Sequence, residues 1–437
     1  MSVGHAPAGV LRYNDGIVAA FGRILGATWR WLVARPPSER RRISPPVPNP
    51  AVPVAPAPAP APAGPQTSGD GFGSNAAARI IEAFDSTHPV RRREKLHGRK
   101  DKLNWLFDTV LFGHQHAIIH GARGSGKTSL AQVFGDYADQ RGAVVIYTSC
   151  ESGSSFSEIL RPYIMSLPDS AVPLLDIAAF SQERQQWPEQ FGPRAVVDLL
   201  TRLSPDCRII MILDEFDRVE NRETNEQIAT LMKLLSDARA PVQILVVGIA
   251  RTIDELIICH PSLRRHLVPI PIGRISRDDV EKLIETGAQR AGLTFTEESR
   301  NEIAHIACGS PYHVQLFCYV AAIEAFRREQ NVVDLVFARA GIQRAFDVWA
   351  MLNPQDAEFF RNLASRDPAE VRAAAVAARE AAELDSLQAD TPGATLLAPA
   401  LCTDGSRRDR LYFRDGAAPQ FLLALLDCLP TRAPVDA

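Results

Sequence analysis

The sequence lacks a long apolar run near its N-terminus and a strong excess of charge of either sign. In residues 8–35, Arg23 and Arg30 interrupt the apolar residues, and no run approaches the roughly 18 residues that a membrane-spanning helix needs. No basic segment precedes this stretch as a secretory signal would require. The formal net charge of −3 provides no whole-chain attraction to nucleic acid. These features argue against an integral membrane protein, a secreted protein and a constitutive, nonspecific DNA binder.

Cysteine is scarce, with seven scattered residues in a chain of 437. Their number is odd and none has the C-x-x-C spacing of a metal or disulfide motif, while several lie in apolar runs where cysteine acts as a small hydrophobe. We therefore expect a reducing, cytoplasmic compartment and no structural metal. Apolar residues make up 46% of the chain, which suffices for the buried cores of two or three domains.

A glycine-rich motif organises the chain. The apolar residues 117–119 predict a strand that leads into Gly-x-x-Gly-x-Gly-Lys-Thr and then into a helix, which is the strand–loop–helix setting of a P-loop. Glycine allows the tight turn that points backbone N–H groups at phosphate oxygens. Lys127 would reach the β- and γ-phosphates and Thr128 would ligate Mg²⁺. The predicted nucleotide-binding residues are Gly121, Ala122, Arg123, Gly124, Ser125, Gly126, Lys127, Thr128 and Ser129, and the predicted cofactors are ATP and Mg²⁺.

A second acidic motif follows an apolar strand at residues 208–213. Asp214 and Glu215 end this strand. Beside a P-loop, such a strand delivers its first carboxylate to Mg²⁺, and the next carboxylate can act on the water that attacks the γ-phosphate. We therefore predict Asp214 as a metal ligand and Glu215 as the catalytic base.

The order of the remaining segments predicts the fold. Further buried strands are expected at 144–147, 242–248 and 267–272, and helical patterns separate them. This alternation demands a parallel sheet covered on both faces, with the ligand at the carboxyl ends of the strands. Residues 168–193, rich in proline and glutamine, are expected to form a partly ordered insertion. The fold class is thus α/β, a P-loop core with a five-stranded parallel sheet.

Helical patterns at 278–291, 296–308, 311–327 and 335–352 predict a helical lid after the core. The C-terminal portion predicts helices at 354–363, 368–387 and 419–429, with strand-like runs at 396–402 and 410–413. Helices followed by a hairpin that carries Arg407, Arg408 and Arg410 look like a winged helix, which would contact DNA with a helix and a basic wing. Residues 373–382 are dominated by alanine, so protein contact or internal packing is the alternative.

The N-terminal segment is set apart from the globular part. Residues 8–35 could form an amphipathic helix that docks on a partner or on the chain itself, or that lies on a membrane surface; a merely nascent helix is the third alternative. Residues 45–65 are almost entirely Pro, Ala and Val and predict an extended tether. The predicted domains are 1–44, the linker 45–75, the P-loop core 76–274, the lid 275–352 and the winged-helix-like domain 353–437.

Three short motifs resemble those of bacterial AAA+ P-loop ATPases of the origin-recognition-like and STAND-like group. Leu96-His97-Gly98-Arg99 resembles the element that lines the nucleotide base, which implies that Gly98 and Arg99 lie near the adenine or ribose. Gly309-Ser310-Pro311-Tyr312 resembles the lid element of this group and implies that Pro311 helps to couple the lid angle to nucleotide. The purely structural alternatives are a helix N-cap turn for the first motif and a helix start for the second.

The segment 260–267 resembles the Ser-x-x-Arg element from which AAA+ proteins project an arginine finger. The resemblance implies that Arg264 or Arg265 contacts the phosphates in a neighbouring subunit, and hence a homo-oligomer; surface arginines on a helix end are the alternative. The chain departs from the family in two places. Gly248-Ile249-Ala250 stands where a polar sensor is usual, with Arg251 or Thr252 as a substitute, and the lid lacks the usual sensor arginine.

Two functions remain open at this stage. The first is an ATP hydrolase in which Lys127, Thr128, Asp214 and Glu215 act with Arg264 or Arg265 of a neighbour to drive or time a conformational change and assembly. The second is a slow nucleotide-gated switch that binds DNA or a signalling partner. A membrane-tethered scaffold, peripheral to the membrane through residues 8–35, is a further alternative.

Overall fold

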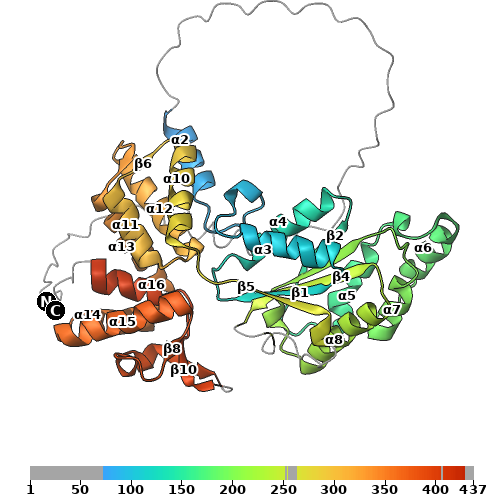
Figure 1. Cartoon of the computed structure of the whole chain (residues 1–437). Coiled ribbons are helices and arrows are strands. Elements are labelled where there is room, and N and C mark those ends of the chain that lie inside the picture. The colour runs from blue at the N-terminus through green and yellow to red at the C-terminus, as the bar shows by residue number, and fades with distance from the viewer. Residues whose placement is uncertain (1–71, 251–252, 254–262, 405–406, 429–437) are drawn as a thin grey trace, which may run out of the picture. The chain divides into compact units, whose positions relative to one another are not determined.

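The computed structural model describes residues 72–250, 253, 263–404 and 407–428 (Figure 1). The chain divides into residues 1–70 and a compact unit, Gly71–Ala437, to which everything below refers. The predictions for residues 8–35, for the tether 45–65 and for Arg251 and Thr252 lie outside the described residues. Within the described ranges, no helix combines the length and apolarity needed to cross a bilayer.

A five-stranded parallel sheet forms the core, as predicted, with the strand order β2-β3-β4-β1-β5. The strands are β1 (His116–Gly121), β2 (Val144–Ser149), β3 (Ile209–Asp214), β4 (Val242–Ile249) and β5 (Leu267–Pro271). In the register, Ile119 of β1 lies beside Val247 of β4 and Ile270 of β5. Because all strands run the same way, the carboxyl ends of β1 and β3 lie at one edge, where the P-loop and the acidic pair follow.

Helices cover both faces of the sheet (Figure 1). One face packs against α3 (Lys100–Leu106), the π-helical turn η2 (Phe107–Phe112) and α4 (Lys127–Asp139). The other packs against α5 (Phe156–Met165), α7 (Pro193–Leu200) and α8 (Arg222–Asp237). Side chains alternate between the two cores, since Ala117 and Ile119 belong to the first and Ile118 to the second. Two buried faces explain why the strands read as continuous apolar runs.

The expected partly ordered insertion at 168–193 is instead built of short helices, so this prediction is wrong. It contains η3 (Asp169–Ala171), η4 (Leu174–Asp176) and α6 (Ile177–Gln185). Phe180 and Trp187 are buried in the core beside α5 and α7, and Arg184 donates to the carbonyl of Leu167. Burial of these aromatic side chains offsets the conformational entropy that is lost when a polar, proline-rich segment becomes ordered.

A buried histidine connects β1 to its neighbours. His116 Nδ1 accepts a hydrogen bond from the Ile244 N–H in β4 at 2.9 Å, and its Nε2 donates to the Met232 carbonyl in α8 at 2.8 Å. This pattern requires a neutral ring with the proton on Nε2. Burial lowers the pKa of His116 to about 4.

We expect this histidine to make folding pH-dependent. The pKa of His116 is lower in the folded protein than in the unfolded chain. The neutral ring therefore stabilises the fold fully above about pH 6.5. As the pH falls toward 4, the free energy of unfolding should decrease by about 3 kcal/mol. The His116→Gln variant should therefore lose less stability than wild type in urea unfolding between pH 7.5 and 5. Replacement of the exposed His114 by Asn is the control and should keep the wild-type pH dependence. Equal pH dependence of His116→Gln and wild type would refute this assignment.

The lid follows β5. Its helices are α10 (Arg277–Ala291), α11 (Glu297–Ala307), α12 (Pro311–Arg327) and α13 (Leu335–Leu352), and a short parallel pair joins β6 (Thr294–Phe295) to β7 (Val332–Val333). Side chains of Ser276, Thr296 and Asp334 cap the helices α10, α11 and α13. At Gly341 the helices α12 and α13 approach so closely that a Cβ would lie 2.6 Å from the Ala321 nitrogen. The preceding helix α2 (Phe72–Ala83) packs on α10 and α12.

The C-terminal domain contains helices and a small antiparallel sheet, and its interpretation as a winged helix stays a prediction. It comprises α14 (Pro354–Ala364), α15 (Pro368–Leu384), β8 (Leu387–Gln388), η7 (Thr395–Ala400), β9 (Leu401–Asp404), β10 (Arg407–Phe413), α16 (Ala418–Leu423) and η8 (Ala424–Cys428). The strands form an antiparallel sheet in the order β8-β10-β9. The strand expected at 396–402 begins only at Leu401, and a 3₁₀ helix precedes it. Pro399 in that helix has no N–H to give to a sheet.

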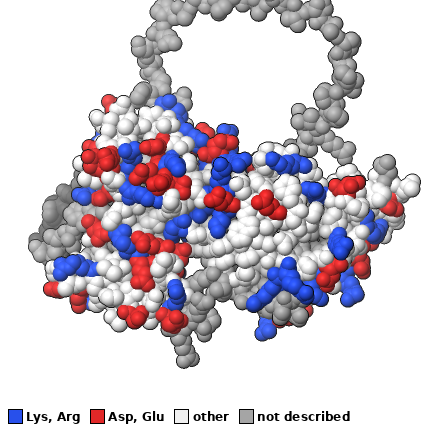
Figure 2. All heavy atoms as spheres, in the orientation of Figure 1, with Lys and Arg blue, Asp and Glu red and all other residues white. Residues whose placement is uncertain are grey.

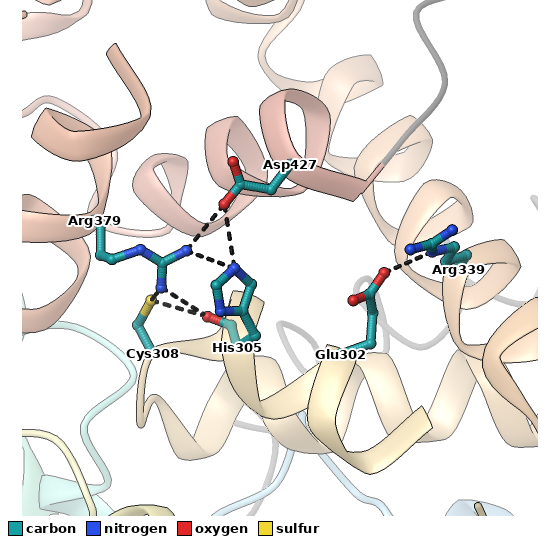
Figure 3. A network of polar contacts seen from close by, with 6 residues as sticks. All are labelled: Glu302, His305, Cys308, Arg339, Arg379 and Asp427. Atoms are coloured by element: carbon teal, nitrogen blue, oxygen red, sulfur yellow. Dashed lines mark hydrogen bonds and ion pairs between the residues drawn. The ribbon is translucent and has the colours of Figure 1, made fainter. Parts of the chain in front are cut away.

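The alanine-rich helix α15 is packed within the protein. Ala374, Ala377, Ala378, Ala381 and Ala382 are buried, and the small side chains let α16 lie close against the helix. On the same helix, Arg379 joins three elements (Figure 3). Its Nη2 lies 3.0 Å from an oxygen of Asp427 in η8 and 2.8 Å from Nε2 of His305 in α11, and its Nη1 donates to the His305 carbonyl. The contacts of α15 thus favour internal packing of this helix.

Candidate nucleotide-binding site

The P-loop connects β1 to α4 and has the backbone that its glycines predict. Gly121, Gly124 and Gly126 all have positive φ angles. A Cβ at Gly121 would lie 2.1 Å from the Ile272 carbonyl oxygen, so only glycine fits between this loop and the residues that follow β5. The loop ends at the first residue of α4, where free backbone N–H groups and the helix dipole favour an anion.

Lys127 is the first residue of α4 and points back into the loop. Its Nζ donates to the Ala122 carbonyl at 2.7 Å, and the side chain is buried. Burial lowers its pKa to about 8, against the opposing attraction of Asp217 and Asp214. A buried ammonium that faces a cradle of backbone N–H groups is suited to bind an anion.

The acidic strand end meets the P-loop helix. Thr128 Oγ1 lies 3.4 Å from Asp214 Oδ1, although 86 residues separate them. The same carboxylate oxygen accepts the Glu215 N–H at 2.9 Å, and its other oxygen accepts the hydroxyl of Tyr147 in β2. A hydroxyl and a carboxylate at the foot of a phosphate-binding loop are the hard oxygen donors that Mg²⁺ prefers, so this pair fits the metal.

Glu215 lies directly beyond this pair with a strained backbone. Its φ of 54° is in the left-handed region, which is costly for glutamate and is common at functional sites. Burial is the main cause that raises its pKa, and Arg218 opposes the shift. Glu215 Oε2 lies 3.2 Å from Nε of Arg218, and both side chains are partly exposed. The carboxylate is therefore accessible to water at the edge of the site.

Arg99 is buried beneath the P-loop. Its Nη2 donates to the Ser125 carbonyl at 3.0 Å and to the Gly273 carbonyl, and burial lowers its pKa to about 10. It therefore links the P-loop to the segment between β5 and the lid. Gly98 has a positive φ and packs so tightly that a Cβ would lie 2.8 Å from Ile275. The expected contact of Gly98 and Arg99 with the adenine or ribose stays a prediction.

The lid approaches the P-loop through the start of α12. Pro311 is the first residue of this helix, and Tyr312 follows it. A Cβ at Gly124 would lie 3.2 Å from Cβ of Tyr312, so the tyrosine packs on the loop. Tyr312 and Tyr147 were not among the predicted site residues. Tyr312 stood within the lid motif, and Tyr147 near the end of a predicted strand, so the sequence held a signal for both.

The proposed arginine finger lies at the other edge of the sheet. Arg264 and Arg265 are exposed in η6 (Leu263–Arg265), immediately before β5. The next residue, His266, accepts the N–H of His116 where β1 begins, at 3.0 Å. The P-loop follows the opposite end of β1. These arginines are therefore separated by the length of the sheet from the P-loop of their own subunit.

The end of β4 carries no polar sensor side chain among its described residues. Gly248, Ile249 and Ala250 are apolar, and Ile249 is 45% exposed. The Ile249 N–H donates to Asp217 Oδ1 at 2.7 Å, which ties this strand end to the turn after Glu215.

Fold and site together define a P-loop nucleotide-binding protein of the α/β class. Residues 110–257 match a family model described as AAA domain. The match confirms the prediction of an AAA+ P-loop ATPase core. No curated protein matches the chain.

Several solved structures are similar to about three quarters of the chain. The RuvB Holliday junction branch migration motor of Thermotoga maritima is 16% identical with a TM-score of 0.40, and the match covers 73% of this chain and 92% of RuvB. The Walker-type ATPase paby2304 of Pyrococcus abyssi is 17% identical with a TM-score of 0.47, covering 78% and 99%. The ORC2 protein of Aeropyrum pernix is 15% identical with a TM-score of 0.45, covering 79% and 96%.

Proposed function

We propose that the protein is a Mg²⁺-dependent ATP hydrolase that uses turnover to drive or time a conformational change and assembly. The observation that carries this proposal is the meeting of Thr128 and Asp214 at 3.4 Å beside Lys127. These groups come from α4 and β3, and a phosphate-binding loop that closes on a carboxylate is the arrangement that phosphoryl transfer requires. Measurement of Mg·ATP hydrolysis by the full chain tests the proposal.

Each side chain has a distinct part in the proposed reaction. The P-loop N–H groups and Lys127 hold the β- and γ-phosphates. Thr128 and Asp214 would hold Mg²⁺, which supplies charge neutralisation on the phosphate oxygens. Glu215 accepts a proton from the attacking water at its carboxylate, and the partial exposure of this group leaves room for the water. Tyr147 donates to Asp214 and thereby orients the carboxylate.

The position of Arg264 and Arg265 supports a reaction shared between subunits. Because they lie at the far edge of the sheet, they would serve the phosphates of a neighbouring copy and not of their own. A guanidinium suits this task since it is always charged and can bind two phosphate oxygens at once.

Mixing two inactive variants tests this arrangement. The Arg264→Ala/Arg265→Ala protein would keep its own site but lack the finger, whereas the Glu215→Gln protein would lack the base but keep the finger. In a random equal mixture, about a quarter of the sites would combine an intact base with a finger from the neighbour, so hydrolysis should reappear at about that fraction of wild type. No gain on mixing, with each variant folded and oligomeric, would exclude a finger acting in trans.

A nucleotide-gated switch is the second candidate function. The apolar end of β4 and the packing of Tyr312 on Gly124 favour slow turnover that times an association. An origin-recognition-like member of the family would make DNA the partner, through the winged-helix-like domain. On the face shown in Figure 2, acidic and basic side chains are intermixed over the lid and this domain, and Arg410 donates to Ser386 at 2.7 Å within its own domain.

One experiment distinguishes the two functions. ATP hydrolysis is measured with and without duplex DNA over a series of protein concentrations. Stimulation by DNA would favour the DNA-linked switch, and a dependence of the specific activity on protein concentration alone would favour the hydrolase with a trans arginine. Membrane tethering through residues 8–35 stays a separate prediction.

A further inference from the structure

A second buried arginine lies beside the P-loop, in the segment that joins β5 to α10. The Ile272 N–H donates to the His120 carbonyl at 2.8 Å, and the next residue accepts from Arg99, so this segment runs along the end of β1. Arg274 comes next, and its side chain is only 10% exposed. Within the described part of the chain, its Nε has no hydrogen-bond partner. A buried guanidinium with an unused donor is costly and needs an anion.

The anion that Arg274 contacts belongs to the C-terminal domain. Asp385 follows α15 and accepts a hydrogen bond from Nη2 of Arg274 at its Oδ1. The aspartate has a left-handed backbone with a φ of 56°, and its side chain is 24% exposed. One carboxylate of the C-terminal domain therefore pairs with a buried cation in the segment that runs beside the P-loop.

Another turn of the C-terminal domain comes near the same loop. A Cβ at Gly416 would lie 3.7 Å from Cβ of Arg123 in the P-loop. The neighbouring Asp415 is anchored by Trp349 in α13, whose Nε1 donates to it at 2.7 Å. The C-terminal domain thus approaches the loop with a fixed turn as well as with Asp385.

We propose that Arg274 is a further binding residue for a phosphate group of the nucleotide, and that Asp385 competes with the nucleotide for it. The inference rests on the proposed function, since it adds a residue to the same site. The polyphosphate and the Asp385 carboxylate are both anions, and the same few cations cannot fully compensate both in a buried site. Binding of nucleotide then breaks the contact between Arg274 and the C-terminal domain, which couples the site to that domain.

The Asp385→Asn substitution tests the competition. It removes the charge and keeps the shape, and asparagine tolerates the left-handed backbone. Titration calorimetry of the full chain with Mg·ATP should show about tenfold tighter binding for Asp385→Asn and about tenfold weaker binding for Arg274→Gln. In the Arg274→Gln background, Asp385→Asn should have no further effect, because the pair no longer exists.

Asp427→Asn is the matched control. It also breaks a charged contact of the C-terminal domain with the lid, but Asp427 pairs with Arg379 and His305 instead of Arg274 (Figure 3). Its Mg·ATP affinity should stay within about twofold of wild type. Equal tightening by Asp427→Asn and Asp385→Asn would mean that domain loosening alone acts, and would overturn the competition. If wild type binds Mg·ATP and Asp385→Asn binds it with the same affinity, this inference alone is overturned. If wild type does not bind Mg·ATP, the proposed function is overturned as well.

Discussion

The Lys127→Ala variant is expected to bind Mg·ATP at least about 100-fold more weakly than wild type. In the wild-type protein, the Lys127 ammonium lies at the start of α4, buried and directed into the loop, where Nζ donates to the Ala122 carbonyl. Triphosphate oxygens would replace this carbonyl as acceptors and would gain a charged hydrogen bond in a dry site. Removal of the side chain leaves the phosphate charge without its principal protein partner. Titration calorimetry or a fluorescent ATP analogue measures the affinity.

The control for this substitution is Lys100→Ala, which removes an exposed lysine from α3 and should leave the affinity unchanged. The pKa of Lys127, lowered to about 8 by burial, adds a pH test. The ammonium loses its proton as the pH rises through that value, so wild-type affinity should fall between pH 7 and 9. Retention of ATP binding within about threefold by Lys127→Ala would exclude the assigned role.

The Glu215→Gln variant is expected to keep ATP affinity but to lose hydrolysis by about 10²- to 10⁴-fold, the usual contribution of a general base. Glutamine preserves the shape of the side chain, but its amide cannot accept the proton of the attacking water. Because Glu215 does not contact the P-loop lysine in the structure, nucleotide binding should be spared. Single-turnover hydrolysis of radiolabelled ATP separates the chemical step from product release.

Glu220→Gln is the matched control, since Glu220 is exposed a few residues after the same strand. Its hydrolysis should equal that of wild type. The raised pKa of Glu215 sets the expected pH dependence: the carboxylate must be ionised to act, so the rate should fall on acidification at a pH above the ordinary range of glutamate. Unchanged hydrolysis by Glu215→Gln at normal ATP affinity would remove the residue from its assigned role.

Local patterns in the sequence predicted the core of the fold. The strand before the P-loop, the strand before Asp214 and the lid helices lie within a few residues of their expected places. Apolar runs bounded by glycine and polar residues specify such elements because side-chain burial and backbone hydrogen bonding act over a few neighbours. The juxtaposition of Thr128 with Asp214 was predicted from the pairing of a P-loop with an acidic strand end in one parallel sheet.

Other features depended on contacts that the local pattern does not contain. Residues 168–193 read as a polar, proline-rich insertion, yet Phe180 and Trp187 find a buried environment against helices elsewhere in the chain. The run 396–402 read as a strand, but Pro399 and the position of β9 place a 3₁₀ helix before it. In both cases the tertiary surroundings outweighed the local composition.

The sequence by itself determined that this chain forms a P-loop domain, because glycine, lysine and carboxylate spacing sets which backbone and side-chain groups can meet at the strand ends. Only the tertiary structure decided which groups from the lid and the C-terminal domain border that loop. The pairing of Arg274 with Asp385 joins residues 111 positions apart. Such a contact arises from the packing of helices whose directions no short stretch of sequence specifies.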